Sequence, residues 1–229
     1  MKAARLLQER ADGLPGAKMR LSKAVPLAAG LGGGSSDAAA ALRGLKKLWG
    51  LGLPSEALVD VAARLGSDVP FFIDGGTALA EGRGERITPL HDAPRQELLI
   101  ALPTLALADK TRRMYSLLAP ADHTDGSAAQ RLADALRQGK PVADEQLFNV
   151  FDGPAFRTFP ELERLRAALL AAGARSVHLA GSGPALFALA EDAAQRERLA
   201  GAAVEAGATT FVAPTAPAAE ALALEVTAG

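Results

Sequence analysis

PLAAGLGGGSSDAAA, the segment from Pro26 to Ala40, is the most informative part of this chain. Four of the five residues from position 30 to position 34 are glycines, which allow positive φ angles and bring the backbone close to a ligand without an intervening Cβ. Ser35 or Ser36 is a good helix N-cap, and apolar residues follow at helical spacing as far as Leu48. A flexible loop of free N–H groups that leads into a helix N-terminus is a binding site for phosphate.

The loop differs from the commoner nucleotide motifs. No lysine follows the glycines as in the phosphate loop, and Ser35 stands where a dinucleotide-binding fingerprint has its third glycine. No Gly-x-Ser-x-Gly elbow is present, so a serine hydrolase is unsupported. A glycine-rich turn that only caps a core helix stays open, although so many glycines cost backbone entropy that a plain turn does not need.

Composition excludes several classes of protein. The chain has 229 residues, of which 49% are hydrophobic and 22% charged, and this is typical of a globular protein with one domain or two small ones. A net charge of -1 and an aromatic content of 4% argue against a nucleic-acid surface. No apolar run approaches membrane-spanning length, and the N-terminus turns polar before a signal-peptide core could form, so we expect a cytoplasmic protein without a membrane partner.

Metal chemistry has little support from the sequence. There is no cysteine, so neither a disulfide framework nor a zinc–thiolate site can form. The three histidines are scattered without ligand spacing, and we interpret His178, in an apolar strand, as a core residue. We therefore expect no metal held by protein ligands alone.

Hydrophobic periodicity predicts the remaining elements. The pattern predicts helices over residues 2–11, 54–65, 127–138, 160–172 and 191–206, beside the helix that follows the glycines and ends near Trp49. It predicts strands over residues 18–25, 77–80, 86–90, 98–103, 176–179, 185–189 and 209–213. From Leu98 on, this order is typical of an α+β sandwich in which helices cover one face of an antiparallel sheet.

A resemblance now emerges from four segments. The motif Pro-x-x-x-Gly-Leu-Gly-Gly-Gly-Ser-Ser-Asp resembles the central ATP motif of the GHMP small-molecule kinases, which include galactokinase and the homoserine and mevalonate kinases. LGSDVPFF (65–72), GRGE (82–85) and AGSGP (180–184) match the same family in the expected order. The resemblance implies a GHMP kinase fold: a ribosomal protein S5 domain 2-like N-terminal domain over residues 1–94, incomplete here, and a ferredoxin-like C-terminal α/β sandwich over residues 95–229, with ATP between them.

The resemblance also implies a reaction. The triple glycine with Ser-Ser-Asp is most similar to the branch that phosphorylates 4-diphosphocytidyl-2-C-methyl-D-erythritol at its 2-hydroxyl in the non-mevalonate isoprenoid pathway. The expected cofactors are ATP and Mg²⁺, and the expected partner is this small-molecule acceptor. The residues expected to bind ATP are Pro26, Leu27, Ala28, Ala29, Gly30, Leu31, Gly32, Gly33, Gly34, Ser35 and Ser36.

Asp68 is the expected catalytic residue. An aspartate between a Gly-Ser turn and an apolar cluster is either a turn former or a desolvated general base. The resemblance favours the second alternative, because the family's aspartate at this place takes the proton from the acceptor hydroxyl. The turn over residues 81–85 is interpreted as a hairpin rather than as a substrate contact.

Further residues are candidates for the acceptor site. The resemblance places Thr111 beside the sugar alcohol and Tyr115, one helical turn on, against the cytosine; a cap formed by residues 109–111 and a half-buried tyrosine is the alternative. Gly181, Ser182 and Gly183 would hold phosphate groups, or would form a plain hairpin turn. For Leu147 and Asn149 we favour a packing role.

One departure from the family matters. Its members begin with strands that carry a catalytic lysine and a Tyr-His pair for the cytosine, and nothing before Lys18 matches them. We expect either a truncated gene model or a shortened protein with reduced turnover and a tendency to aggregate. Another GHMP kinase, or a nucleotide-binding module with impaired turnover, stays open as an alternative function, and the protein is expected to be a monomer or homodimer.

Overall fold

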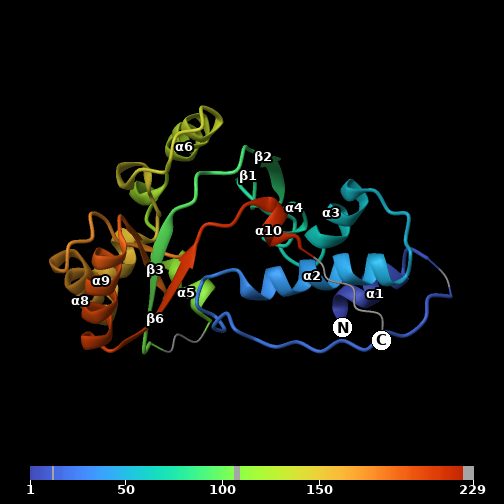
Figure 1. Ribbon diagram of the computed structural model, residues 1–229, viewed down its shortest axis with the longest axis horizontal. Coiled ribbons are helices and arrows are strands. Elements are labelled where there is room, and N and C mark those ends of the chain that lie inside the picture. Colours follow the sequence, from blue (N-terminus) through green and yellow to red (C-terminus); the bar gives the residue numbers. More distant parts are fainter. Residues whose placement is uncertain (12, 106–108, 224–229) are drawn as a thin grey trace. The chain divides into compact units, whose positions relative to one another are not determined.

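The computed structural model describes residues 1–11, 13–105 and 109–223, which form helices and two antiparallel sheets (Figure 1). The chain divides into two compact units. The first contains residues 1–27, 32–92 and the described residues from Ala216 on; the second contains residues 28–31 and 93–215. A domain division into 1–94 and 95–229 stays a prediction, and these units differ from it in three segments: residues 28–31, residues 93–94 and the residues from Ala216 on.

The first unit is mainly helical. Its elements are α1 (Lys2–Gln8), α2 (Gly33–Leu48), α3 (Ser55–Ala63), α4 (Phe71–Asp74), the strands β1 (Ala78–Glu81) and β2 (Arg86–Pro89), and α10 (Ala218–Ala221). Leu7, Leu42 and Val61 are fully buried where α1, α2 and α3 meet. The strands pair Ala78 with Pro89 and Glu81 with Arg86, which confirms the predicted hairpin.

α2 is the central helix of this unit. Ala39, Leu42 and Leu45 recur on one face and are buried, as the periodicity predicted. The predicted serine N-cap is wrong: the helix begins at Gly33, and Gly32 is its N-cap with φ 67°. The left-handed conformation of Gly32 turns the chain into the helix three residues before Ser35, so both serines lie inside the first turn.

The predicted strand over residues 18–25 is also wrong. The backbone there is without regular secondary structure, and neither sheet of the described chain includes it. The side chains of Met19 and Leu21 are 46% and 64% exposed. Alternation alone does not make a strand, because a strand also needs a neighbour to pair with.

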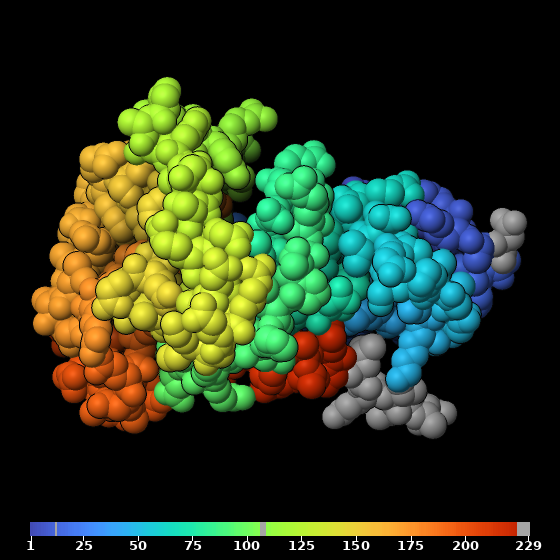
Figure 2. Space-filling view, turned by 90° about the horizontal axis from the view of Figure 1, so that it is seen from above, coloured from blue at the N-terminus to red at the C-terminus, as the bar shows by residue number. Residues whose placement is uncertain are grey.

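The C-terminal segment packs on the first unit. The Ala218 N–H donates to both carboxylate oxygens of Asp92, at 3.2 Å each. A Cβ added at Gly76 would lie 2.9 Å from the Cβ of Ala218, so glycine is needed for this close packing. Figure 2 shows the red segment that contains α10 against the green residues that follow the hairpin.

The second unit is an α/β sandwich. Its sheet has the order β4-β5-β3-β6 and is antiparallel throughout. Its strands are β3 (Glu97–Pro103), β4 (His178–Leu179), β5 (Leu186–Ala190) and β6 (Ala208–Pro214). The prediction that the apolar strand over 98–103 is central is confirmed, since β3 pairs with β5 on one side and with β6 on the other.

The helical elements of this unit are α5 (Lys110–Ser116), α6 (Ser127–Arg137), α7 (Asp152–Thr158), α8 (Pro160–Ala171), α9 (Ala193–Glu205) and the short 3-10 turns η1 (Pro120–Asp122) and η2 (Asp144–Gln146). In Figure 1, α8 and α9 lie together on one face of the sheet. Leu162 and Leu199 from these helices pack with Leu99 and Leu186 of the strands, and all four are fully buried.

Candidate active site

The second half of the glycine-rich segment forms the N-terminus of α2. A Cβ at Gly32 would lie 2.7 Å from the ring of Phe72, and one at Gly33 would lie 2.8 Å from the side chain of Val25. A Cβ at either position would therefore force the neighbouring side chain to move, and at Gly32 the φ of 67° also favours glycine. Gly34 is different: it is exposed, and nothing lies within 4 Å of an added Cβ. The open space at Gly34 leaves room for a ligand at the helix N-terminus, where free N–H groups and the helix dipole favour an anion.

Two charged side chains lie beside this N-terminus. The Lys23 Nζ is 2.5 Å from Asp37 Oδ2, and both side chains are partly exposed. The same Nζ would be 3.3 Å from a Cβ at Gly33, so the ammonium lies next to the first turn of α2. The hydroxyl of Ser36 donates to the Gly33 carbonyl at 2.9 Å. Lys23 was not among the predicted site residues, because its only signal in the sequence is a basic residue three positions before Pro26.

Asp68 lies in the turn between α3 and α4. Its side chain is exposed, whereas the next two residues, Val69 and Pro70, are buried and anchor the turn. A Cβ at Gly84, in the β1–β2 turn, would lie 3.7 Å from Asp68 Oδ1 and 3.7 Å from the Ser67 carbonyl oxygen. The structure thus brings together two of the segments that carried the resemblance, residues 65–72 and residues 82–85.

α4 links Asp68 to the start of α2. The ring of Phe72, four residues after Asp68, is the group that contacts Gly32. Arg43, on α2, donates from Nη1 to the Phe72 carbonyl, and burial lowers the pKa of its guanidinium. These contacts hold the turn of Asp68 and the N-terminus of α2 within one packed cluster of the first unit.

The first half of the glycine-rich segment docks on the second glycine loop. Ala29 is 2% exposed, and its carbonyl accepts a hydrogen bond from the Ala185 N–H at 3.1 Å. Gly30 has φ 89°, and a Cβ there would lie 2.0 Å from the Ala180 carbonyl oxygen and 2.7 Å from that of Gly183. Only glycine permits this approach. Two loops that lie about 150 positions apart in the sequence numbering therefore touch in the second unit.

Asn149 holds the second loop. Its Nδ2 donates to the carbonyls of Leu179 and Gly181 at 2.9 and 2.7 Å, and its Oδ1 accepts from the Phe151 N–H at 3.0 Å. The packing role predicted for Asn149 stays a prediction, and the structure shows that this residue supports the loop through hydrogen bonds. Within the loop, Gly181 is exposed, Ser182 is half-buried and Gly183 is buried.

Lys110 ties the two loops together. Its Nζ donates to the Ala28 carbonyl at 3.0 Å and also to the Gly183 carbonyl. Burial lowers the pKa of this ammonium. Residues 109–111 were predicted to cap a helix, and Asp109 is the N-cap of α5, with φ 46° and no side-chain capping hydrogen bond. No local pattern could have shown the contacts of Lys110, because its partners lie more than 70 positions away.

Thr111 and Tyr115 are exposed one helical turn apart on α5. Positions i and i+4 of a helix share a face, so the two side chains are neighbours. Tyr115 is 62% exposed, and its ring packs edge-on against Phe151 with centroids 5.1 Å apart. The ring is supported on one side and open on the other, as a stacking platform would require.

His178 makes a defined contact inside the second unit. Its Nδ1 lies 2.7 Å from Asp152 Oδ2, whose other oxygen accepts the Leu179 N–H at 2.8 Å. Among the described residues no group of three or more His, Cys, Asp or Glu side chains is arranged to hold a metal ion. None of the helices that the structure describes has both the length and the apolar character needed to cross a membrane.

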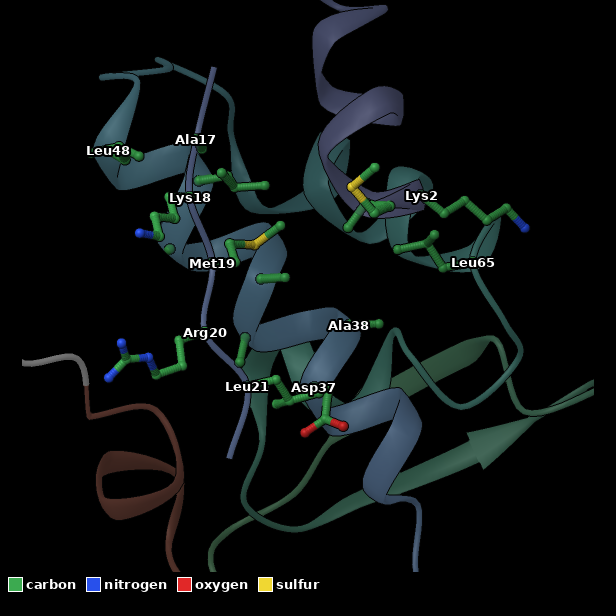
Figure 3. Close-up of a pocket in the computed structure, with 16 residues that line it drawn as sticks. Lys2, Ala17, Lys18, Met19, Arg20, Leu21, Asp37, Ala38, Leu48 and Leu65 are labelled. Carbon is green, nitrogen blue, oxygen red and sulfur yellow. The ribbon is translucent and has the colours of Figure 1, made fainter. Parts of the chain in front are cut away.

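A pocket of about 580 Å³ follows the side of α2 in the first unit (Figure 3). Residues 17–21 form one wall, where Met19 and Leu21 face α2 while Arg20 points away. Most of the lining is apolar, with Asp37 as the carboxylate at its edge. A mostly apolar lining does not suit a phosphate group. We therefore do not assign this pocket to the phosphates that the glycine loop could bind.

Comparison with known protein families gives two matches along the chain. Residues 1–76 match the GHMP kinases N terminal domain, and residues 124–225 match the GHMP kinases C terminal domain. Together the two matches include the glycine-rich segment, Asp68 and the second glycine loop.

Comparison with curated proteins finds 4-diphosphocytidyl-2-C-methyl-D-erythritol kinases. That of Dehalococcoides mccartyi is 45% identical over 199 residues, which are 86% of this chain and 70% of the relative. That of Exiguobacterium sibiricum is 41% identical over 201 residues, 86% of this chain and 68% of the relative.

Solved structures give the same result. A crystal structure of 4-(cytidine 5'-diphospho)-2C-methyl-D-erythritol kinase matches with a TM-score of 0.76 and 38% identity over 92% of this chain and 76% of the other. Homoserine kinase from Cytophaga hutchinsonii matches with a TM-score of 0.63 and 18% identity over 85% and 68% of the two chains. The second likeness is one of fold alone.

Proposed function

This chain belongs to the GHMP kinase family, in its 4-diphosphocytidyl-2-C-methyl-D-erythritol kinase branch, and we propose that it uses ATP to phosphorylate the 2-hydroxyl of that sugar alcohol. The observation that supports this acceptor is the sequence identity of 45% with a kinase of that name. The identity with a homoserine kinase is only 18%. The reaction would contribute to the non-mevalonate route to isoprenoid precursors, in the cytoplasm, and the protein would act as a monomer or homodimer.

The glycine-rich segment is our proposed ATP site. The N–H groups from Gly30 to Ser36 would bind the β- and γ-phosphates, with Pro26 to Ala29 as the approach. The open space at Gly34 and the helix N-terminus behind it support this assignment, since together they accept an anion without a side chain in the way. Phosphoryl transfer depends chiefly on such positioning and charge stabilisation.

Asp68 is the proposed general base. Its carboxylate would accept the proton of the acceptor hydroxyl while the oxygen attacks the γ-phosphorus and ADP leaves. Asp68 is exposed, so an acceptor can reach it, and its turn is fixed by the buried Val69 and Pro70. The packing of α4 on α2 supports its place near the phosphate loop.

Mg²⁺ would be held largely by ATP, because the residues that the structure describes include no cluster of three or more His, Cys, Asp or Glu side chains arranged for a metal ion. Mg²⁺ in kinases is bound by phosphate oxygens, waters and one or two protein oxygens, so a protein cage is not required. The hydroxyls of Ser35 and Ser36, in the first turn of α2, are the residues that would contact it. When bound, the ion would offset charge on the triphosphate.

The acceptor would be held by residues of the second unit. We assign the cytosine to Tyr115, whose ring is open on one side, and the sugar alcohol to Thr111 on the same face of α5. Gly181, Ser182 and Gly183 would contact phosphate groups of the acceptor. The rigid support of this loop by Asn149 favours a binding role over a plain hairpin turn.

A coupled assay of ADP release tests the acceptor. The purified chain is supplied with ATP and, in separate reactions, 4-diphosphocytidyl-2-C-methyl-D-erythritol, homoserine, mevalonate and phosphomevalonate. We expect ADP release with the first alcohol alone. Equal or faster turnover of another alcohol would replace the proposed acceptor, and ATP binding without any turnover would favour a nucleotide-binding module.

A further inference from the structure

Lys110 occupies an unusual place at the junction of the two glycine loops. It is the first residue of α5, and its ammonium donates to one carbonyl from each loop, those of Ala28 and Gly183. Within the described chain, its hydrogen-bond partners are these two carbonyl oxygens, and no carboxylate pairs with it. Among the residues that the structure describes, no carboxylate therefore neutralises the charge of this ammonium.

The surroundings of Lys110 would otherwise oppose an anion. Carbonyl oxygens carry partial negative charge, and Ala28, Gly30, Ala180 and Gly183 bring four of them close together where the loops touch. A phosphate group at that place would be repelled unless a cation offset these dipoles. Lysine supplies a compact charge with three N–H donors, and the two carbonyls use two of them.

A purely structural role does not account for a lysine here. The residue is half-buried, and burial disfavours its charged form. Holding two carbonyls requires a donor but not a charge, and a neutral donor would avoid the desolvation cost of an unpaired ammonium. A positive charge on Lys110 is explained if the ammonium contacts an anion when a ligand is bound.

We propose that Lys110 positions the two loops and donates its third N–H to the phosphoryl group that ATP transfers. The loop of Ala28 is assigned to ATP and that of Gly183 to the acceptor, so their junction is where this group would pass between them. The inference rests on the proposed function in one respect, which is that the donor nucleotide is ATP. It does not depend on which alcohol is the acceptor.

The test compares ATP and ADP binding in four proteins. Equilibrium dissociation constants are measured without acceptor for the wild-type chain, Lys110→Met, Lys110→Arg and Lys140→Met. Lys140 is an exposed lysine of the same unit and serves as the matched control. Because hydrogen bonds to charged groups are worth more than neutral ones, Lys110→Met should bind ATP about tenfold more weakly or worse. ADP affinity should change far less, and Lys110→Arg should recover most of the ATP affinity.

Other outcomes overturn the inference. An equal loss of ATP and ADP affinity in Lys110→Met would show that Lys110 only holds the two loops together. Unchanged ATP affinity would show that Lys110 has no role in ATP binding. Thermal denaturation checks the fold, and Lys110→Gln replaces the methionine variant if that one is not native. A wild-type chain that binds ATP but phosphorylates none of the four alcohols refutes the proposed function and leaves the comparison at Lys110 valid.

Discussion

Asp68 is the residue whose change should separate nucleotide binding from phosphoryl transfer. Asn has nearly the same shape but cannot accept the hydroxyl proton as a carboxylate does. We expect Asp68→Asn to lower kcat by about 10²–10⁴-fold, the usual contribution of a general base. ATP affinity should stay unchanged, because the phosphate would be bound by backbone amides of another segment. Steady-state kinetics and ATP titration measure the two effects.

Asp60→Asn is the matched control for this change. Asp60 is an exposed aspartate of the same unit, on α3, eight positions before Asp68. Its loss removes the same charge and should leave kcat within about twofold, since surface substitutions are usually near neutral. Full turnover by Asp68→Asn would show that another group takes the proton.

Gly30 and Gly34 should respond to alanine in opposite directions. A Cβ at Gly30 would overlap the carbonyl oxygen of Ala180 at 2.0 Å and would be strained by φ 89°. Gly30→Ala should therefore destabilise the fold by about 1–3 kcal/mol and lower the melting temperature. Gly34 lies inside α2 with free space around it, so Gly34→Ala should raise the melting temperature slightly. Calorimetry measures the two melting temperatures. Equal shifts in Gly30→Ala and Gly34→Ala would contradict the docking of the glycine-rich segment on the second glycine loop.

Among the elements, the second glycine loop depends on one side chain from another segment. Asn149→Asp keeps the shape of Asn149 but removes the N–H groups that bond to the Leu179 and Gly181 carbonyls. Leaving these acceptors unpaired should cost about 1–3 kcal/mol of stability. It should also raise the KM for the acceptor more than the KM for ATP. Gln138→Glu, an exposed amide on the same unit, is the control and should change neither.

The spacing of apolar residues correctly predicted the helices and strands whose buried face can be recognised within a single segment. α2 and β3 were predicted because Leu42, Leu45 and Leu99 repeat at the spacing of a helix face or a strand. The segment 18–25 alternates equally well, but no described strand pairs with it, and pairing is not encoded in one segment. The serine cap failed because the glycine at position 32 could start the helix earlier.

The roles proposed for the glycine segment and for Asp68 follow from residue type and order, and they stay predictions. The side chains that support these segments could not be predicted from the sequence. Lys110 and Asn149 act through carbonyl groups 30 or more positions away, so only the fold reveals them. The same holds for the junction of the two glycine loops at Gly30.

For the molecule as a whole, low net charge coincides with an exposed apolar segment. The net charge is -1 and the isoelectric point about 6.3, so electrostatic repulsion between copies is weak near neutral pH. Met19, Leu21 and Leu27 are 46%, 64% and 80% exposed within ten residues of one another. Clustered apolar surface promotes association when repulsion is weak.

The double change Met19→Ser and Leu21→Ser should therefore slow aggregation of the 229-residue chain. Light scattering at pH 6.3 should fall clearly relative to wild type. The difference should narrow at pH 8.5, which lies further above the isoelectric point of about 6.3, because net negative charge then grows and copies of the chain repel one another more. The melting temperature should hardly change, because neither side chain belongs to the buried core. Val204→Ser removes an exposed valine of α9, outside residues 19–27, and should not alter scattering. If it protects as well as the double change, aggregation does not start at residues 19–21.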